Sequence, residues 1–140
     1  MTDALTIGVE EEYQIIDPKT RELTGRAGHV MAIAQDAGDA NVQREVYQSQ
    51  IEIATSICDS LAEARAELVR ARSTIINAAR QDGNAIAAAG THPFSDWRDQ
   101  EVTPKERYQN LVQDYRQIMQ DLVIFGCHVH VGISDREVAV

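Results

Sequence analysis

Three short segments of this chain alternate polar and apolar side chains, and that alternation constrains the fold more than any other feature. The segments are residues 7–15, 49–54 and 125–132. Successive side chains of a β-strand point to opposite faces of a sheet, so residues two apart share a face. One face would then carry the polar members of the three segments, namely Glu10, Glu12, Gln50, Glu52, His128 and His130. The opposite face would carry Val9, Tyr13, Ile51, Ile53, Cys127, Val129 and Val131.

A sheet face of this kind indicates a divalent-metal site. Clustered carboxylates repel one another and raise each other's pKa unless a cation lies among them. Magnesium and manganese prefer oxygen ligands and leave coordination positions open for phosphate. Glu10 and Glu12 are therefore the first candidate ligands. The alternative for this pair is a strand edge exposed to water.

Glu52 is the next candidate, because it lies between Ile51 and Ile53 in the middle of a segment. Burying a lone carboxylate is costly, which favours a ligand role, whereas an edge strand would leave Glu52 in water. Glu45 lies an odd number of residues earlier and would join the site only through a bulge or a bend. Glu11 faces the apolar side, so we assign it no metal role, and an arginine on a helix is its candidate partner.

His128 and His130 form a His-x-His pair on one strand face. Both can bind a metal, or one can bind it while the other hydrogen-bonds a substrate. The alternative is a pair of histidines that serve packing or hydrogen bonding. A closed zinc site is disfavoured because Cys127 points to the other face. Cys58 is expected to be a packing residue, because no group that would activate its thiol is evident.

The amino-acid composition limits the classes of binding partner that the protein can have. The net charge of −9, from 22 acidic and 13 basic residues, argues against a general nucleic-acid or anionic-membrane surface. No run approaches the roughly 18 apolar residues of a membrane span, and no signal peptide is evident at the N-terminus. Two cysteines in such a chain suggest reduced thiols. We therefore expect a cytoplasmic protein with no nucleic-acid or membrane partner.

The remaining patterns predict an α+β fold, a largely antiparallel sheet with helices packed on its apolar face. Strands are expected at residues 5–16, 45–55, 85–89 and 126–133, and helices at 28–37, 60–81 and 104–122. Capping boxes mark two helix starts, Ser60 with Glu63 and Thr103 with Glu106. The last helix should direct apolar residues inward, namely Tyr108, Leu111, Tyr115, Ile118 and Leu122.

A loop follows the small-residue strand at residues 85–89, and loops in such positions often carry binding groups. Thr91 and His92 lie in this loop, and Arg98 follows next to Trp97. These residues are candidates for contacting a carboxylate-bearing substrate. The alternative is a capped turn without a binding role.

Four segments taken together resemble the bacterial carboxylate–amine ligase family, the second type of glutamate–cysteine ligase, which is related in fold to glutamine synthetase. They are residues 8–13, 50–55, 90–94 and 125–132, which stand in the family's order and extend the resemblance over nearly all 140 residues. The resemblance implies an ATP-dependent ligase in which Mg²⁺ (or Mn²⁺) bridges the ATP phosphates to the sheet. The γ-carboxylate of glutamate would be phosphorylated, and the amine of cysteine would attack the acyl phosphate.

By motif position, the resemblance implies Glu10, Glu12, Glu52 and His128 as metal ligands and Glu45 as a further acidic position. It implies a substrate-side role for His130 and for the loop at residues 90–94. Family members are well over twice as long, so residues 1–140 would be the N-terminal part of a catalytic domain, inactive alone. The family also suggests a homodimer. A non-catalytic metal- or partner-binding module and a metallohydrolase remain as alternatives.

Overall fold

The structure is a computed structural model, and it describes the chain except for residues 1–4, 39–40, 122, 136 and 138–140 and the side chains of residues 116–121. Its elements are β1 (Thr6–Ile16), α1 (Ala27–Asp36), β2 (Val42–Arg44), β3 (Gln50–Ala54), α2 (Leu61–Gln81), β4 (Ala85–Ala87), the 3-10 helix η1 (Trp97–Asp99), α3 (Glu106–Asp121) and β5 (Cys127–Gly132). None of the helices in the described part of the chain is long and apolar enough to cross a membrane.

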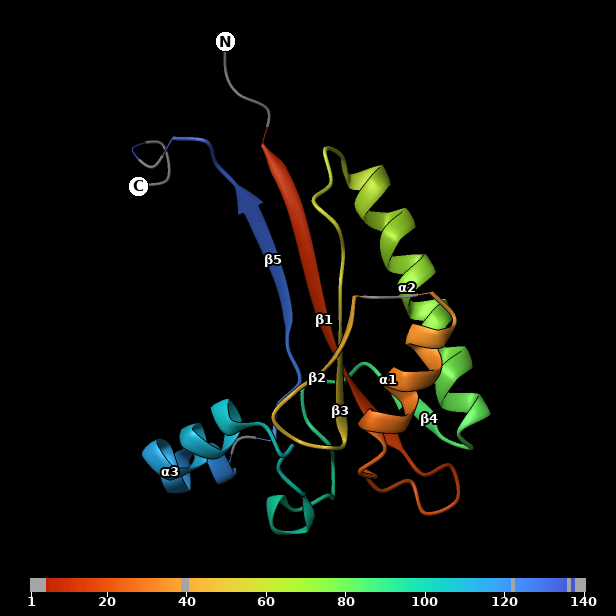
Figure 1. The fold of residues 1–140 in the computed structure, drawn as a ribbon, viewed down its shortest axis with the longest axis vertical. Coiled ribbons are helices and arrows are strands. Elements are labelled where there is room, and N and C mark those ends of the chain that lie inside the picture. The colour runs from red at the N-terminus through yellow and green to blue at the C-terminus, as the bar shows by residue number, and fades with distance from the viewer. Residues whose placement is uncertain (1–4, 39–40, 122, 136, 138–140) are drawn as a thin grey trace.

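β1 is the central strand of one antiparallel sheet (Figure 1). One edge of β1 pairs with β3, which in turn pairs with β2. The other edge is shared: β5 pairs along Thr6–Glu11, and β4 pairs along Gln14–Ile16. The predicted fold class, an antiparallel sheet with helices on one face, is confirmed. The helices α1 and α2 cover that face.

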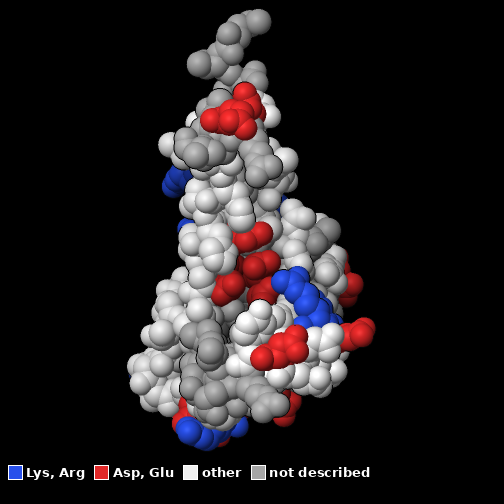
Figure 2. Space-filling view, turned by 90° about the vertical axis from the view of Figure 1, so that its left-hand side faces the viewer, with Lys and Arg blue, Asp and Glu red and all other residues white. Residues whose placement is uncertain are grey.

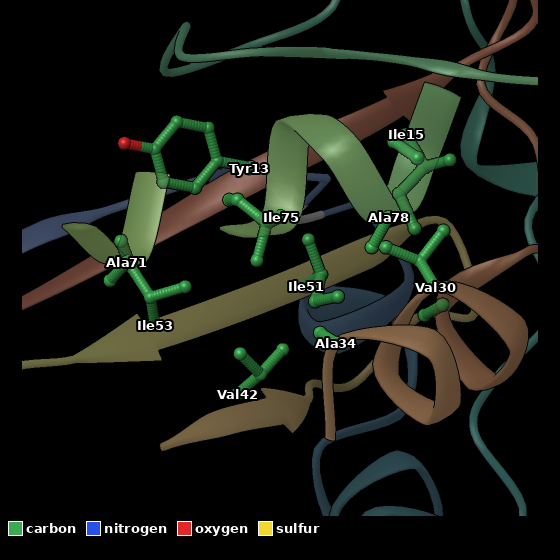
Figure 3. Packing of buried hydrophobic residues seen from close by; sticks show 12 residues of the cluster. Tyr13, Ile15, Val30, Ala34, Val42, Ile51, Ile53, Ala71, Ile75 and Ala78 are labelled. Atoms are coloured by element: carbon green, nitrogen blue, oxygen red, sulfur yellow. The ribbon is translucent and has the colours of Figure 1, made fainter. Parts of the chain in front are cut away.

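The core lies between the apolar sheet face and the helices α1 and α2 (Figure 3). Ile15, Ile51, Ile53 and Ile75 are fully buried there, and burying a side chain of this size contributes roughly 2 kcal/mol. The predicted capping box of α2 is confirmed in its first half, because Ser60 Oγ accepts a hydrogen bond of 3.2 Å from the backbone N–H of Glu63. The Glu63 carboxylate accepts from Asp59 N rather than from Ser60 N.

One charged side chain of β1 also lies on this apolar face. Glu11 pairs with Arg72 of α2, through hydrogen bonds from both Nε and Nη2 of the guanidinium. The Tyr13 hydroxyl donates to the same carboxylate. The expected arginine partner for Glu11 is therefore present, and the pair ties α2 to the central strand.

The predicted strand at residues 45–55 is too long. β3 begins at Gln50, and residues 45–49 form the turn that joins it to β2. The alternation of apolar and polar residues extends into this turn because Tyr47 is a buried apolar residue. Tyr47 nevertheless pairs with Val102 and not with a strand of the sheet. β2 was missed because three residues are too few to show a period of two. β4 likewise ends at Ala87 instead of residue 89.

The prediction for α3 is wrong in its start and in its packing. The helix begins at Glu106, and its first carbonyl acceptor is that of Lys105, which receives hydrogen bonds from Tyr108 N and Gln109 N. Thr103 does not cap it, because that side chain is fully buried and its Oγ1 has no partner among the described residues.

α3 lies beside η1 and away from the apolar sheet face (Figure 1). Tyr108 is buried as expected, but Tyr115 is 56% exposed. Ile118 and Leu122 lie outside the described side chains. The helix α3 is held away from the sheet face because Tyr108 packs at the β2–β3 turn, where its hydroxyl donates to Arg44 O.

Candidate functional site

The polar side chains of three strands meet on the face of the sheet opposite α1 and α2. Strand register places Glu12 opposite Glu52, and Glu10 opposite His128. β3 is an interior strand, because β2 pairs with its other edge, so the edge-strand alternative for Glu52 is wrong. Figure 2 shows acidic side chains gathered in a hollow on this side of the molecule.

Glu10 contacts both histidines of β5. Its Oε2 lies 3.0 Å from His130 Nε2 and 3.4 Å from His128 Nδ1. The hydrogen bond with His130, reinforced by the charges of the two histidines, lowers the pKa of Glu10. All three side chains remain partly open to water, with 36–59% of each exposed. This end of the polar face therefore holds one carboxylate against two imidazoles.

Glu12 is held by donors from two other segments. Its Oε2 accepts a hydrogen bond of 2.7 Å from Gly126 N and one of 2.8 Å from Gln50 Nε2. A Cβ on residue 126 would lie 3.2 Å from His128 Nε2, which is tighter than ordinary packing, so glycine permits this approach. The backbone just before β5 thus reaches the middle of the polar face.

Glu52 lies in the middle of the carboxylate cluster. Burial, followed by the negative charges of Glu45, Glu10 and Glu12, raises its pKa to about 7, and His128 offsets these effects in part. Among the described residues, none donates a hydrogen bond to this carboxylate. Repulsion of this kind is what a bound cation would relieve.

Glu45 reaches the same place from the β2–β3 turn, which supplies the bend that the strand pattern required of it. Its Oε1 accepts a hydrogen bond of 3.2 Å from the Tyr108 hydroxyl, and its Oε2 accepts one of 3.1 Å from Val46 N. Burial, together with the charge of Glu45, raises the pKa of Tyr108 to about 12.

Part of this cluster borders an open pocket of about 240 Å³. It is lined by Glu12, Glu45, Val46, Gln50, Ile124, Gly126 and His128. Sequence reasoning placed Gln50 on the polar face but gave it no role. It also gave no role in the site to Gly126 or Tyr108. The glutamine and the glycine lay within the recognised segments, whereas nothing local to residue 108 predicts its contact with Glu45.

Most of the predicted substrate residues lie elsewhere. His130 is beside Glu10, but Thr91, His92 and Arg98 do not line the pocket. His92 joins its own loop to the segment that follows β1: Nδ1 accepts from Ser95 N at 3.1 Å, so Nε2 carries the proton and donates to Arg21 O at 3.0 Å. A substrate role for these residues stays a prediction.

Arg98 and Thr91 also have local partners. The Arg98 guanidinium pairs with Asp96 at 2.8 Å and lies 4.7 Å from the centre of the Trp97 ring. Thr91 pairs with Ile124 in an isolated bridge, which brings the loop beside the segment that leads into β5. The loop therefore borders the candidate site through its backbone.

The donor set suits a hard divalent cation, since it combines several carboxylates with imidazole nitrogens. Their side chains do not yet converge, because in the described part of the chain no three His, Cys, Asp or Glu residues are arranged to hold one metal ion. Glu10 turns toward His130, and Glu12 toward Gly126 and Gln50. Binding one metal ion would therefore require Glu10 to rotate away from His130, whereas Glu12 can keep its Oε2 contacts with Gly126 and Gln50 and offer Oε1.

The sequence matches known proteins over nearly its whole length. A model of the glutamate-cysteine ligase family 2 (GCS2) matches residues 6–140. A protein of Roseiflexus castenholzii that carries the provisional name glutamate–cysteine ligase 2 is 47% identical over 135 residues, which are 96% of this chain and 36% of that protein. A protein of Herpetosiphon aurantiacus with the same provisional name is 44% identical over 135 residues, 96% of this chain and 35% of its own. The chain thus spans about a third of the length of the curated relatives it matches.

Two solved structures share the fold. A glutamate–cysteine ligase from Francisella tularensis, in complex with AMP, matches 97% of this chain and 28% of its own, with a TM-score of 0.66 and 15% identity. A bifunctional glutathione synthetase from Pasteurella multocida matches 97% of this chain and 18% of its own, with a TM-score of 0.65 and 16% identity.

Proposed function

The chain belongs to the glutamate-cysteine ligase family 2, and on that basis we propose that the protein is an ATP-dependent carboxylate–amine ligase. The proposed substrates are glutamate and cysteine, and the proposed product is γ-glutamylcysteine. The observation that carries the proposal is the polar sheet face, where four carboxylates gather; burial and the negative charges of the other three raise the pKa of Glu52 to about 7.

Glu10, Glu12, Glu52 and His128 would hold Mg²⁺ or Mn²⁺, with Glu45 as a fifth donor. When bound, such ions would neutralise the charge of the ATP phosphates and of the phosphoryl group in transfer. The cluster supports this reading because ATP is itself an anion. A face with several carboxylates repels it unless cations intervene.

The proposed reaction has two steps. A γ-carboxylate oxygen of glutamate attacks the γ-phosphorus of ATP, and ADP leaves. The amine of cysteine then attacks the acyl carbon, inorganic phosphate leaves, and the amine gives up a proton. We propose a substrate-side role for His130, which lies 3.0 Å from Glu10 and is 59% exposed.

We further propose the partners, the cellular location and the assembly of the protein. The partners would be ATP and small amino acids rather than nucleic acid or membrane, and the location would be the cytoplasm. Residues 1–140 would be the N-terminal part of the catalytic domain, and a homodimer is the proposed assembly.

The test is an ADP-release assay on the protein as its native source makes it, with Mg²⁺. ADP release that requires both glutamate and cysteine, with one ADP for each amide bond, is the expected result. The Glu12→Gln variant should lose this activity, whereas Glu11→Gln, on the opposite sheet face, should keep it. Amide or ester hydrolysis by the same protein without ATP would instead favour a metallohydrolase and contradict the proposal.

A further inference from the structure

Two buried glutamines face each other across the central strand pair. Gln14 of β1 pairs with Gln50 of β3, and both point to the polar face. Their exposed fractions are 1% and 5%. Each donates a hydrogen bond to the backbone of a segment that borders this face: Gln14 Nε2 to Ala89 O at 3.0 Å, and Gln50 Nε2 to Ile124 O at 3.2 Å.

The two bordering segments are themselves joined. Phe125 N donates to Gly90 O at 3.0 Å, and Thr91 pairs with Ile124. The two glutamines therefore have the same structural role, since each hydrogen-bonds one of the two joined segments that border the polar face. A role that belongs to only one of them has to come from a further contact.

That further contact belongs to Gln50. Its Nε2 also donates to Glu12 Oε2 at 2.8 Å, and Gly126 N donates to the same oxygen at 2.7 Å. Hydrogen bonds to an ionised acceptor are stronger than those between neutral groups. One carboxylate oxygen thus receives two donors, and among the described residues none donates to Oε1.

We propose that Gln50 is a positioning residue for Glu12, holding one carboxylate oxygen so that the other is free to bind a divalent cation. This inference rests on the proposed function, because it takes Glu12 to be a metal ligand. A side chain already fixed in one conformation loses less entropy when it binds. Groups that orient a metal ligand in this way typically change metal affinity by about 10- to 100-fold when they are removed.

The same geometry explains why a glutamine suits the position. A glutamate at residue 50 would place another negative charge against Glu12 and could not donate. An apolar residue would leave Glu12 with the Gly126 donor alone. An amide supplies two N–H groups without charge, and Gln50 uses one nitrogen for both the carboxylate and Ile124 O.

The test compares matched variants, Gln50→Met and Gln14→Met, in the protein as its native source makes it. Methionine is similar in length and donates no hydrogen bond. Mn²⁺ affinity is measured by electron paramagnetic resonance of the free ion, and exchange of the Gly126 amide hydrogen is measured without metal. We expect Mn²⁺ to bind about tenfold more weakly to Gln50→Met, whereas Gln14→Met stays within twofold of the parent, and only Gln50→Met should speed exchange at Gly126.

Three outcomes would overturn the inference. Unchanged Mn²⁺ affinity in Gln50→Met, with the parent binding well, would refute it and leave the proposed metal site intact. Equal losses of Mn²⁺ affinity in both variants would mean that weaker attachment of the two bordering segments, and not the Gln50–Glu12 contact, causes the effect. A parent that binds no Mn²⁺ would refute the proposed metal site and the inference with it. If Gln50→Met does not fold, Gln50→Asn withdraws the amide by one methylene and should weaken binding in the same way.

Discussion

The two faces of the sheet place half-buried carboxylates in opposite surroundings. On the apolar face, Glu11 accepts hydrogen bonds from Arg72 and from Tyr13, and the Arg72 contact lowers the pKa of Glu11. On the polar face, Glu52 lies among other carboxylates, and its pKa is raised to about 7. These residues belong to neighbouring strands and have the same chemistry, so only their surroundings differ.

The contrast between Glu11 and Glu52 distinguishes a carboxylate that stabilises the fold from one that is available to bind a ligand. A carboxylate with its own arginine is a finished internal contact, and it serves to attach α2 to β1. A carboxylate surrounded by like charges makes the folded state less favourable and is explained best by a ligand.

The largest expected effect is on the apolar face. Replacing Arg72 with methionine would leave Glu11, which is only 13% exposed, without its cation. Because Arg72 itself is 45% exposed, the loss is expected to be smaller than for a fully buried pair, about 2 kcal/mol of unfolding free energy. Urea denaturation monitored by circular dichroism measures it.

The matched control is Arg98→Met. Arg98 and its partner Asp96 are 66% and 46% exposed, so the loss should stay within about 0.5 kcal/mol. Equal losses in the two variants would mean that the Glu11 pair is no more important than a surface pair. The apolar half of the comparison would then fail.

The pH dependence of stability probes the polar face. Since burial and its neighbours raise the pKa of Glu52 from 4.5 to about 7, the folded protein keeps a proton there that the unfolded chain loses. Between these values the folded state binds more protons, so the free energy of unfolding should fall as pH rises. The fall should be on the order of 1 kcal/mol, because partial exposure screens the repulsion.

Urea denaturation without divalent metal, at pH 5 and pH 8, measures this fall. The Glu52→Gln variant should show a smaller fall, and added Mg²⁺ should reverse it in the parent. Glu10 and Glu11 do not interfere, because their pKa values are lowered and they titrate below this range. Stability that rises from pH 5 to pH 8 in the parent but not in Glu52→Gln would contradict the assignment.

The smallest effect is expected at Tyr108, which joins α3 to the polar site. Tyr108→Phe removes the hydroxyl that donates to Glu45 Oε1 and Arg44 O, each at 3.2 Å. The expected cost is about 0.5–1 kcal/mol of unfolding free energy. Tyr115→Phe is the control on the same helix, because Tyr115 is 56% exposed and should tolerate the change. No difference between the two variants would mean that the Tyr108 contact adds nothing.

The period of two in three segments was enough to predict which residues share each sheet face. It placed Glu10, Glu12, Glu52 and His128 together, and it placed Glu11 on the opposite side, because side-chain direction in a strand follows from local geometry. The sheet and the capping of α2 followed from similarly local patterns.

Long-range placement could not be predicted in the same way. Glu45 enters the site through a turn, and Tyr108 reaches it from a helix 63 residues later in the chain. The apolar pattern of α3 suggested packing on the sheet, but whether a helix covers a sheet depends on the path of the connecting chain. The donors to Glu12 were missed for a related reason, because one of them is a backbone N–H, which side-chain patterns do not reveal.

The most direct test of the central claim is Mn²⁺ binding by Glu12→Gln and Glu11→Gln, neighbours on one strand that face opposite sides. Both remove one negative charge, so a difference between them reports position rather than net charge. The account predicts that Glu12→Gln binds Mn²⁺ at least about tenfold more weakly than the parent, while Glu11→Gln binds it within about twofold. Equal affinities in the two variants would contradict the division of the sheet into a structural face and a cation-binding face.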